Sequence, residues 1–146
     1  MRVLLDTNVV IDVLQKREPW FESGKAIFLA IANRQITGCL TAKQIADLYF
    51  FSRKQFTGTE NVDEKARKVI TGLLGLVEIL DTKAEDCQNA ISIKNNDYQD
   101  AILISTAQRE KVDYIVTRNP EHFLHSAVPF LSPDEFLPIL HQKETK

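Results

Sequence analysis

The amino-acid sequence predicts an α/β fold in which a mostly parallel sheet of four or five strands is covered by helices on both faces. Short apolar runs of strand length alternate with longer stretches whose apolar residues recur at helical spacing. Parallel neighbours need crossover connections, which these helical stretches supply. At 146 residues and 44% hydrophobic content, the chain is of the right size for one buried core. We therefore expect a single domain over residues 1–140, followed by a polar tail at 141–146.

The strand candidates are short apolar runs bounded by polar or turn-forming residues. The first ends at the polar sequence Asp6-Thr7-Asn8, and the last is a short edge strand. In chain order the five runs are residues 2–5, 36–40, 77–80, 114–117 and 128–131.

The helix candidates carry apolar residues three and four positions apart. Pro19 ends the first, Thr41 is a suitable N-cap for the third, and Gly58 lies in the clearest loop, residues 55–61. In chain order the helical stretches are residues 9–14, 20–33, 42–50, 62–74, 84–93, 98–109 and 133–140.

Composition excludes several classes of protein. The net charge of −2 does not provide the broad basic surface of ordinary nucleic-acid-binding proteins. No stretch approaches the roughly 18 to 20 uninterrupted apolar residues of a membrane helix, and polar residues interrupt the N-terminal run before a signal-peptide core could form. A cytoplasmic protein without a membrane span is expected. Cys39 and Cys87 lack the spacing of zinc or redox sites, which predicts reduced packing residues.

Two isolated acids lie where a fold of this class could use them. Ligands of open parallel sheets bind beyond the carboxyl ends of the strands, and Asp6 lies at such an end. Asp6 is equally suited to cap the following helix. Asp47 lies among apolar residues of its helix, and its alternative role is a surface ion pair with Lys43, four residues earlier. Neither acid decides the function alone.

A pair of acids and a polar turn complete the candidates. Asp97 and Asp100 are three positions apart in the first turn of a helix, where they are also ordinary partners of the helix dipole, with a capping box formed by Asn96 and Gln99. Thr117-Arg118-Asn119-Pro120 follows the fourth strand, and its Asn either initiates a turn or provides an oxygen ligand. The histidines nearby have no partner at metal-binding spacing, so we expect surface or packing roles for His122 and His125.

Carboxylates that converge at one sheet edge select hard cations such as Mg²⁺ or Mn²⁺, and these cations are suited to phosphate chemistry. Basic residues around such a site would offset the repulsion between the acids and a nucleic acid. The candidates for this rim are Lys16, Arg17, Lys43, Arg53, Lys54 and Arg118.

Over nearly its whole length the chain resembles the PIN-domain nucleases, and more narrowly the toxin ribonucleases of VapBC-type toxin–antitoxin pairs. Residues 3–12, Val-Leu-Leu-Asp-Thr-Asn-Val-Val-Ile-Asp, resemble the opening strand, turn and helix of the family. There Asp6 corresponds to a metal ligand, while Thr7 and Asn8 shape the turn. This segment is the most specific match.

The other acids match the family position by position. Asp100, followed by Ala, matches the third acid, and Asp97 resembles an additional acid of one branch. Asp47 takes the place of the second acid, which is usually Glu. Residues 116–120 and Phe123 resemble the closing segment, but many members have Asp where this chain has Asn119. This departure removes one negative charge, so a three-acid site is supported more firmly than a four-acid site.

The resemblance implies a fold, an activity and partners. The fold is a three-layer α/β/α sandwich, the activity is hydrolysis of RNA, and the partners are a second copy of the chain and a small antitoxin whose tail enters the acidic groove. The implied ligands of Mg²⁺ or Mn²⁺ are Asp6, Asp47, Asp97 and Asp100. The implied supporting or substrate-contacting residues are Thr7, Asn8, Thr117, Arg118 and Asn119.

Three other classes of protein share features with this sequence. A haloacid dehalogenase-type enzyme also begins with a strand-end Asp but requires a second Asp where this chain has Asn8. A receiver domain requires paired acids before its phosphoacceptor strand and a later strand-end Lys, and neither arrangement is found. The serious alternative is a catalytically silent PIN scaffold that binds RNA or protein, for which Asn119 and the short side chain of Asp47 are the arguments.

Overall fold

The structure, a computed structural model, describes residues 1–144 and has a central sheet of five parallel strands in the order β3-β2-β1-β4-β5. This confirms the predicted α/β class and the parallel sheet. The strands are β1 (Arg2–Leu5), β2 (Thr37–Thr41), β3 (Glu78–Leu80), β4 (Tyr114–Val116) and β5 (Phe130–Leu131). Because β1 is central, its carboxyl end lies between those of β2 and β4.

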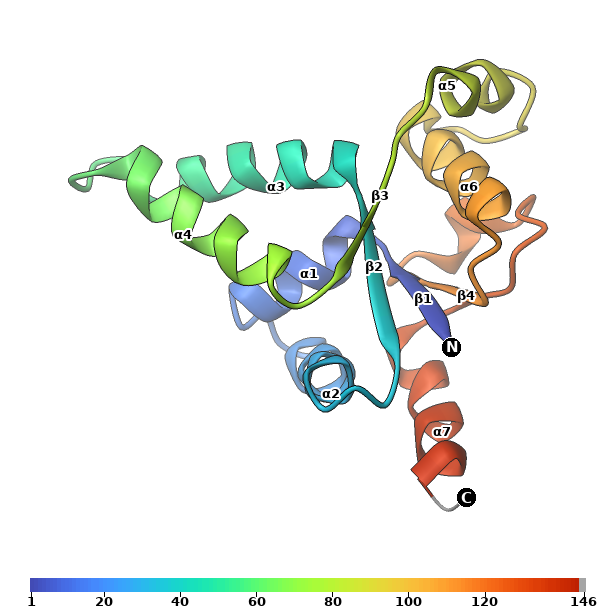
Figure 1. The fold of residues 1–146 in the computed structure, drawn as a ribbon, viewed down its shortest axis with the longest axis horizontal. Coiled ribbons are helices and arrows are strands. Elements are labelled where there is room, and N and C mark those ends of the chain that lie inside the picture. The colour runs from blue at the N-terminus through green and yellow to red at the C-terminus, as the bar shows by residue number, and fades with distance from the viewer. Residues whose placement is uncertain (145–146) are drawn as a thin grey trace.

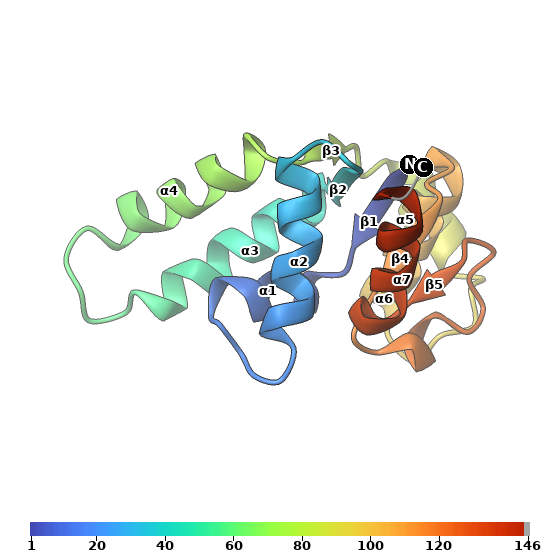
Figure 2. The same cartoon turned by 90° about the horizontal axis from the view of Figure 1, so that it is seen from below.

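Helices cover both faces of the sheet, as Figures 1 and 2 show. The helices are α1 (Thr7–Leu14), α2 (Phe21–Ala32), α3 (Ala42–Gln55), α4 (Val62–Leu74), α5 (Ala84–Ala90), α6 (Tyr98–Glu110), α7 (Pro133–Glu144) and the short 3₁₀ helix η1 (Pro120–Phe123). On one face pack α1, α2 and α7 with the inner parts of α3 and α4, while α6 and η1 cover the other face. The arrangement is the expected three-layer sandwich.

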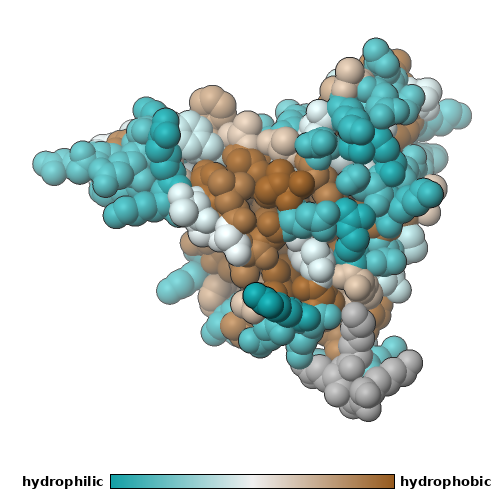
Figure 3. All heavy atoms as spheres, in the orientation of Figure 1, coloured by the Kyte–Doolittle hydropathy of each residue, from teal (hydrophilic) through white to brown (hydrophobic). Residues whose placement is uncertain are grey.

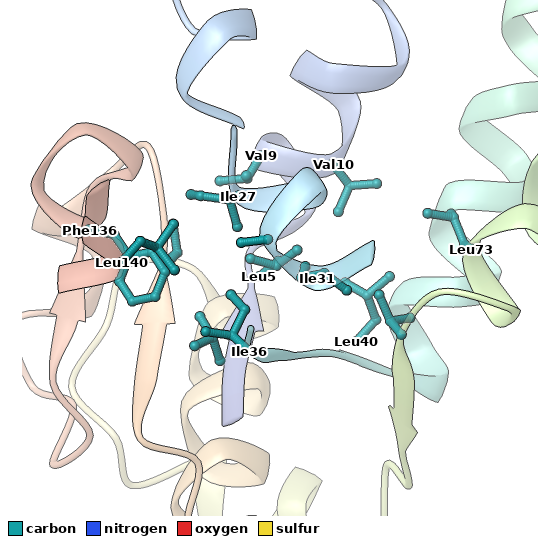
Figure 4. Close-up of a cluster of buried hydrophobic side chains, with 14 of the residues drawn as sticks. Leu5, Val9, Val10, Ile27, Ile31, Ile36, Leu40, Leu73, Phe136 and Leu140 are labelled. Carbon is teal, nitrogen blue, oxygen red and sulfur yellow. The ribbon is translucent and has the colours of Figure 1, made fainter. Parts of the chain in front are cut away.

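Alternate residues of each strand supply the two cores, as the period of two in a β-strand requires. Val3 and Leu5 face the core that includes Ile27 and Phe136, part of which is drawn in Figure 4. Leu4 faces the opposite core, which contains residues of α6. Burial on both faces explains why the β1 sequence is an uninterrupted apolar run.

The α3–α4 pair forms an arm that extends away from the sheet. α3 runs outward from the end of β2, and α4 returns along it (Figures 1 and 2). Hydrophilic side chains cover the tip of this arm and the α5–α6 side, whereas apolar side chains gather in the middle of the face between them (Figure 3). A groove lined by residues of α3 and α6 begins where this arm leaves the sheet.

Several local expectations differ from the structure, and one concerns the third helix, since α3 continues to Gln55 past the predicted stretch 42–50. The helix predicted to reach Ile93 ends at Ala90, because the next three N–H groups bond to carbonyls three residues back instead of four. The last helix continues past Leu140, so residues 141–144 of the expected polar tail are helical, and residues 145–146 lie outside the described part. The N-cap of α6 is Asp97 instead of Asn96. No helix within residues 1–144 has the length and apolar character needed to cross a membrane.

Candidate active site

Asp6 joins the carboxyl ends of β1 and β4. It caps α1 through its Oδ1, which accepts a hydrogen bond from the Thr7 N–H at 2.7 Å. Its Oδ2 accepts from the Thr117 hydroxyl at 2.8 Å, and its own N–H donates to the Val116 carbonyl at 2.8 Å. Only 8% of the residue is exposed. The capping and site interpretations of Asp6 are thus compatible, because one oxygen caps the helix while the other faces β4.

Gln44 holds the turn that carries Asp6. It forms a capping box with Thr41 at the start of α3, and its Nε2 donates to the Leu5 carbonyl at 2.8 Å and to the Thr7 hydroxyl at 3.1 Å. Our sequence reasoning identified Thr41 as a cap but did not single out Gln44. The Thr-x-x-Gln pattern signals the capping box. The bond to Leu5 depends on the pairing of β1 with β2 and has no local signal.

Asp97 and Asp100 lie at the start of α6 in different roles. Asp97 is the N-cap, since its Oδ1 accepts from the N–H groups of Gln99 at 2.8 Å and Asp100 at 3.3 Å. The expected cap at Asn96 is therefore wrong, because the Asp97 carboxylate already accepts these hydrogen bonds. Asp97 is exposed, whereas Asp100 points into the groove beside Asp6.

His122 contacts Asp100, which sequence reasoning missed. Its Nδ1 lies 3.0 Å from the Asp100 Oδ2, and it belongs to η1, which follows β4. We had expected a surface or packing role because no second histidine stands at ligand spacing. Its partner is a carboxylate from another element, which spacing along the chain does not reveal. His125 makes no comparable contact with the acids among the described residues.

Burial and mutual repulsion destabilise the charged forms of the two central acids. Burial, together with the negative charges of Asp6 and Asp97, raises the pKa of Asp100 to about 6. The hydrogen bond and charge of His122 oppose this shift. Burial also raises the pKa of Asp6, although the hydrogen bonds from Thr117 and Thr7 oppose the shift. Because the ionised forms of these carboxylates are destabilised, a nearby cation would stabilise them.

Asp6, Asp47 and Asp100 line one groove with a volume of about 340 Å³. Asp47 lies on its α3 wall, and its Oδ2 is 2.5 Å from the Nζ of Lys43. The i,i+4 ion pair expected of Asp47 is confirmed, and the residue also lines the groove. Asp97 is not part of the groove lining, but its charge acts on both Asp6 and Asp100.

The oxygen donors in the groove match the preferences of a divalent cation. Within residues 1–144, no three acidic, histidine or cysteine side chains stand close enough together to form a complete protein cage. Mg²⁺ does not need one, because it commonly keeps several waters and binds through one or two carboxylates. Asp6 and Asp100 provide only oxygen donors, and each carries a raised pKa. These two carboxylates fit a hydrated Mg²⁺ or Mn²⁺.

The remaining predicted residues support the strand ends. The Asn8 Oδ1 accepts from the Arg118 N–H at 3.4 Å, and the Asn119 N–H donates to the Thr117 hydroxyl at 3.0 Å. Arg118 forms an ion pair with buried Asp12 at 2.9 Å, and its guanidinium lies 4.0 Å from the centre of the Trp20 ring. Arg118 is therefore directed toward α1 and does not line the groove.

The family model described as PIN domain matches residues 2–121. The structure is similar to VapBC2 from Rickettsia felis bound to a DNA fragment from its promoter, with a TM-score of 0.65 and 18% identity over 90% of this chain and 98% of that chain. It is also similar to FitAcB from Neisseria gonorrhoeae, with a TM-score of 0.64 and 21% identity over 90% and 97%.

A more distant similarity is to VapC20 of Mycobacterium tuberculosis, described as a toxin that cleaves the sarcin–ricin loop. The TM-score is 0.57 and the identity 8%, over 77% of this chain and 86% of that chain. No curated protein sequence matches the chain significantly. At these identities, the similarities to solved structures support the fold.

Proposed function

The chain belongs to the PIN domain family, and from this premise we propose that it is a Mg²⁺- or Mn²⁺-dependent endoribonuclease, the toxin of a toxin–antitoxin pair. The observation that carries the proposal is the meeting of Asp6 and Asp100 in one groove. They come from a strand end and from a helix start far apart in the sequence, and both have raised pKa values. Such a pair is suited to hold a cation against a phosphodiester.

Different residues would bind the cation and orient its ligands. Asp6 and Asp100 would hold the cation, with Asp47 and Asp97 adding negative charge nearby. A bound Mg²⁺ or Mn²⁺ supplies positive charge against the phosphodiester and activates a water for hydrolysis. Thr117 and the Thr7 N–H fix the orientation of the Asp6 carboxylate.

Supporting contacts keep the groove in shape. Gln44 connects the start of α3 to the end of β1, which positions the α3 wall beside Asp6. His122 lies against Asp100 and opposes the rise of its pKa. Lys43 places a cation on the same wall, where a phosphate oxygen could compete with Asp47 for it.

The solved neighbours support the toxin role and the choice of RNA. One is described as a toxin that cleaves the sarcin–ricin loop, and others are described as VapBC or FitAB complexes. We therefore propose a small antitoxin as the partner of this chain. Co-expression with the neighbouring open reading frame tests the partner. Failure of that product to bind the chain or suppress its activity would contradict the toxin role.

The activity is tested with purified protein and single-stranded RNA in Mg²⁺, in Mn²⁺ and in EDTA. We expect cleavage with either cation, none in EDTA, and at least a hundredfold loss in Asp6→Asn, which removes one ligand charge. Asp81→Asn is the matched control, because Asp81 also follows a strand of the same sheet but lies outside the groove. Equal cleavage in EDTA or by Asp6→Asn would overturn the mechanism. RNA binding without cleavage would favour the silent scaffold.

A further inference from the structure

We propose that one face of α3 is a track for single-stranded RNA, in which Phe50 stacks on an unpaired base and Lys54 contacts the backbone phosphate. The inference rests on the proposed nuclease function and adds the form of RNA that the site accepts. We call this face the α3 track and define it by Lys43, Asp47, Phe50, Phe51 and Lys54.

The α3 track is continuous with the acidic site. Its members are spaced by three or four positions along α3, so they lie on one side of the helix. All five line the same groove as Asp6 and Asp100. Lys54 lies seven positions after Asp47 on the helix, which corresponds to about 10 Å along the axis. RNA held at the carboxylates would therefore continue along this wall.

Phe50 is a large aromatic side chain left open to solvent at this position. It is 63% exposed, and its ring also borders two further hollows beside the groove, one of which contains Arg53 and Gly58. Its neighbour Phe51 is more buried and faces Arg17, with the guanidinium 5.8 Å from the ring centre. An exposed ring next to the proposed phosphate site is suited to base stacking, since every base presents a π face.

Lys54 supplies the charge that a phosphate needs. Within residues 1–144, Lys54 has no ion-pair partner, whereas Lys43 is paired with Asp47 and Arg53 lies near Asp63. The chain carries a net charge of −2, so RNA gains little from the protein surface as a whole. A free cation at the end of the groove therefore has a large share in holding a backbone.

Charge complementarity favours RNA over an apolar partner on this face. An apolar helix would remove Lys54 and the carboxylates from water without providing opposite charges. Single-stranded RNA provides a phosphate for Lys54 and a base for Phe50. A duplex provides the phosphate only, because its bases are already stacked on one another.

The test measures binding separately from cleavage. A fluorescein-labelled 12-nucleotide single-stranded RNA is titrated with Asp6→Asn protein in Mg²⁺ buffer and followed by anisotropy. Adding Phe50→Ala should weaken binding about tenfold or more, while Phe50→Trp should preserve it. Adding Lys54→Ala should weaken binding and reduce the slope of log K against log salt by about 0.7.

The controls remove equivalent groups elsewhere. Ile91→Ala removes a side chain that is 74% exposed just after the end of α5, and Lys68→Ala removes an exposed cation on α4; both should leave the affinity unchanged. A duplex of the same sequence should bind the Phe50→Ala protein as well as it binds its parent. Circular dichroism and gel filtration verify that each variant keeps its fold and oligomeric state.

The outcomes separate this inference from the function on which it rests. If the wild-type protein cleaves RNA and Phe50→Ala binds and cleaves equally well, the α3 track is wrong and the nuclease function stands. If Phe50→Ala changes the oligomeric state and leaves RNA affinity intact, the face is an interface between copies and the track is again wrong. A wild-type protein that neither binds nor cleaves RNA overturns both.

Discussion

Asp6 caps α1 and also lines the groove. Its two oxygens accept hydrogen bonds from different elements, Thr7 of α1 and Thr117 beyond β4, while the residue is almost fully buried. Hydrogen bonds to the charged form make that burial tolerable, yet the pKa remains raised because desolvation is the larger effect. The Asp6 carboxylate is therefore well oriented and incompletely neutralised, as a cation ligand should be.

Asp100 should destabilise the cation-free protein at neutral pH. Its pKa rises from 3.8 to about 6 on folding, so the ionised form is disfavoured in the folded state. This loss of stability begins as the pH rises above 3.8, the pKa of the group in the unfolded chain. It is complete once the pH is above the folded-state pKa of about 6. In EDTA at pH 7.5, Asp100→Asn should raise the free energy of unfolding by about 1–2 kcal/mol. Urea unfolding measures this.

The pH dependence provides the control for that prediction. The difference between Asp100→Asn and wild type should shrink as pH falls from 7 toward 4, because the carboxyl becomes protonated in both states. Asp81→Asn, which changes an exposed acid, should show no such dependence. Destabilisation by Asp100→Asn at pH 7.5 would show that ionised Asp100 does not destabilise the folded protein.

Among the elements, α6 has to be held firmly because its first turn carries Asp100. The buried Asp86 of α5 does this by accepting from Arg109 Nε at 2.8 Å, from the Thr106 hydroxyl at 3.0 Å and from the Lys83 N–H at 2.9 Å. Burial raises the pKa of Asp86, but these hydrogen bonds together outweigh it and leave the pKa below the usual value. This network joins α5 to α6.

Breaking the Asp86 network should be costly. Arg109→Met leaves a buried carboxylate without its counter-charge, so we expect a loss of about 3–5 kcal/mol at pH 7, measured by urea unfolding. The pKa of Asp86 is lowered on folding. Its contribution to stability is therefore fully present above its pKa in the unfolded chain and disappears as the pH falls through its pKa in the folded protein. Arg67→Met is the matched control. It removes a 75%-exposed partner of Asp63 and should cost less than about 1 kcal/mol. Similar losses in both variants would contradict the network.

At the scale of the whole molecule, the parallel sheet brings together residues from both halves of the chain. β1 and β4 are neighbours, so the segments that follow them meet at one edge, and α3 and α6 provide the two walls. This edge collects negative charge that the rest of the fold does not neutralise. A cation that binds there should therefore stabilise the entire domain.

Cation binding should be visible without any substrate. At pH 7.5, Mg²⁺ at about 100 times its Kd should add about 2.7 kcal/mol to the stability of the folded protein, because the unfolded chain has no assembled site. For a domain of this size, we expect Tm to rise by about 5–10 °C in a thermal melt. The rise should be absent in Asp6→Asn and in NaCl of equal ionic strength. An equal rise in Asp6→Asn would show that the cation binds elsewhere.

Much of the fold could be predicted because its signals are local. The β1 and β4 runs, the helix at residues 62–74 and the Thr41 cap follow from periodicity and capping chemistry within a few residues. The end of α5 was less predictable, since a change from four-residue to three-residue hydrogen bonding has no strong sequence pattern. Asp6 and Asp100 were identified as candidates from a strand end and a helix start.

The sequence by itself therefore determined the elements, their parallel arrangement and the acids that a sheet edge could collect. Only the tertiary structure decided which partners those acids have. Gln44 bonds to Leu5, His122 contacts Asp100, and Arg118 pairs with Asp12 instead of lining the groove. Each contact joins residues from different elements, and its geometry depends on strand register and helix packing. Local propensities act over a few residues and do not determine either one.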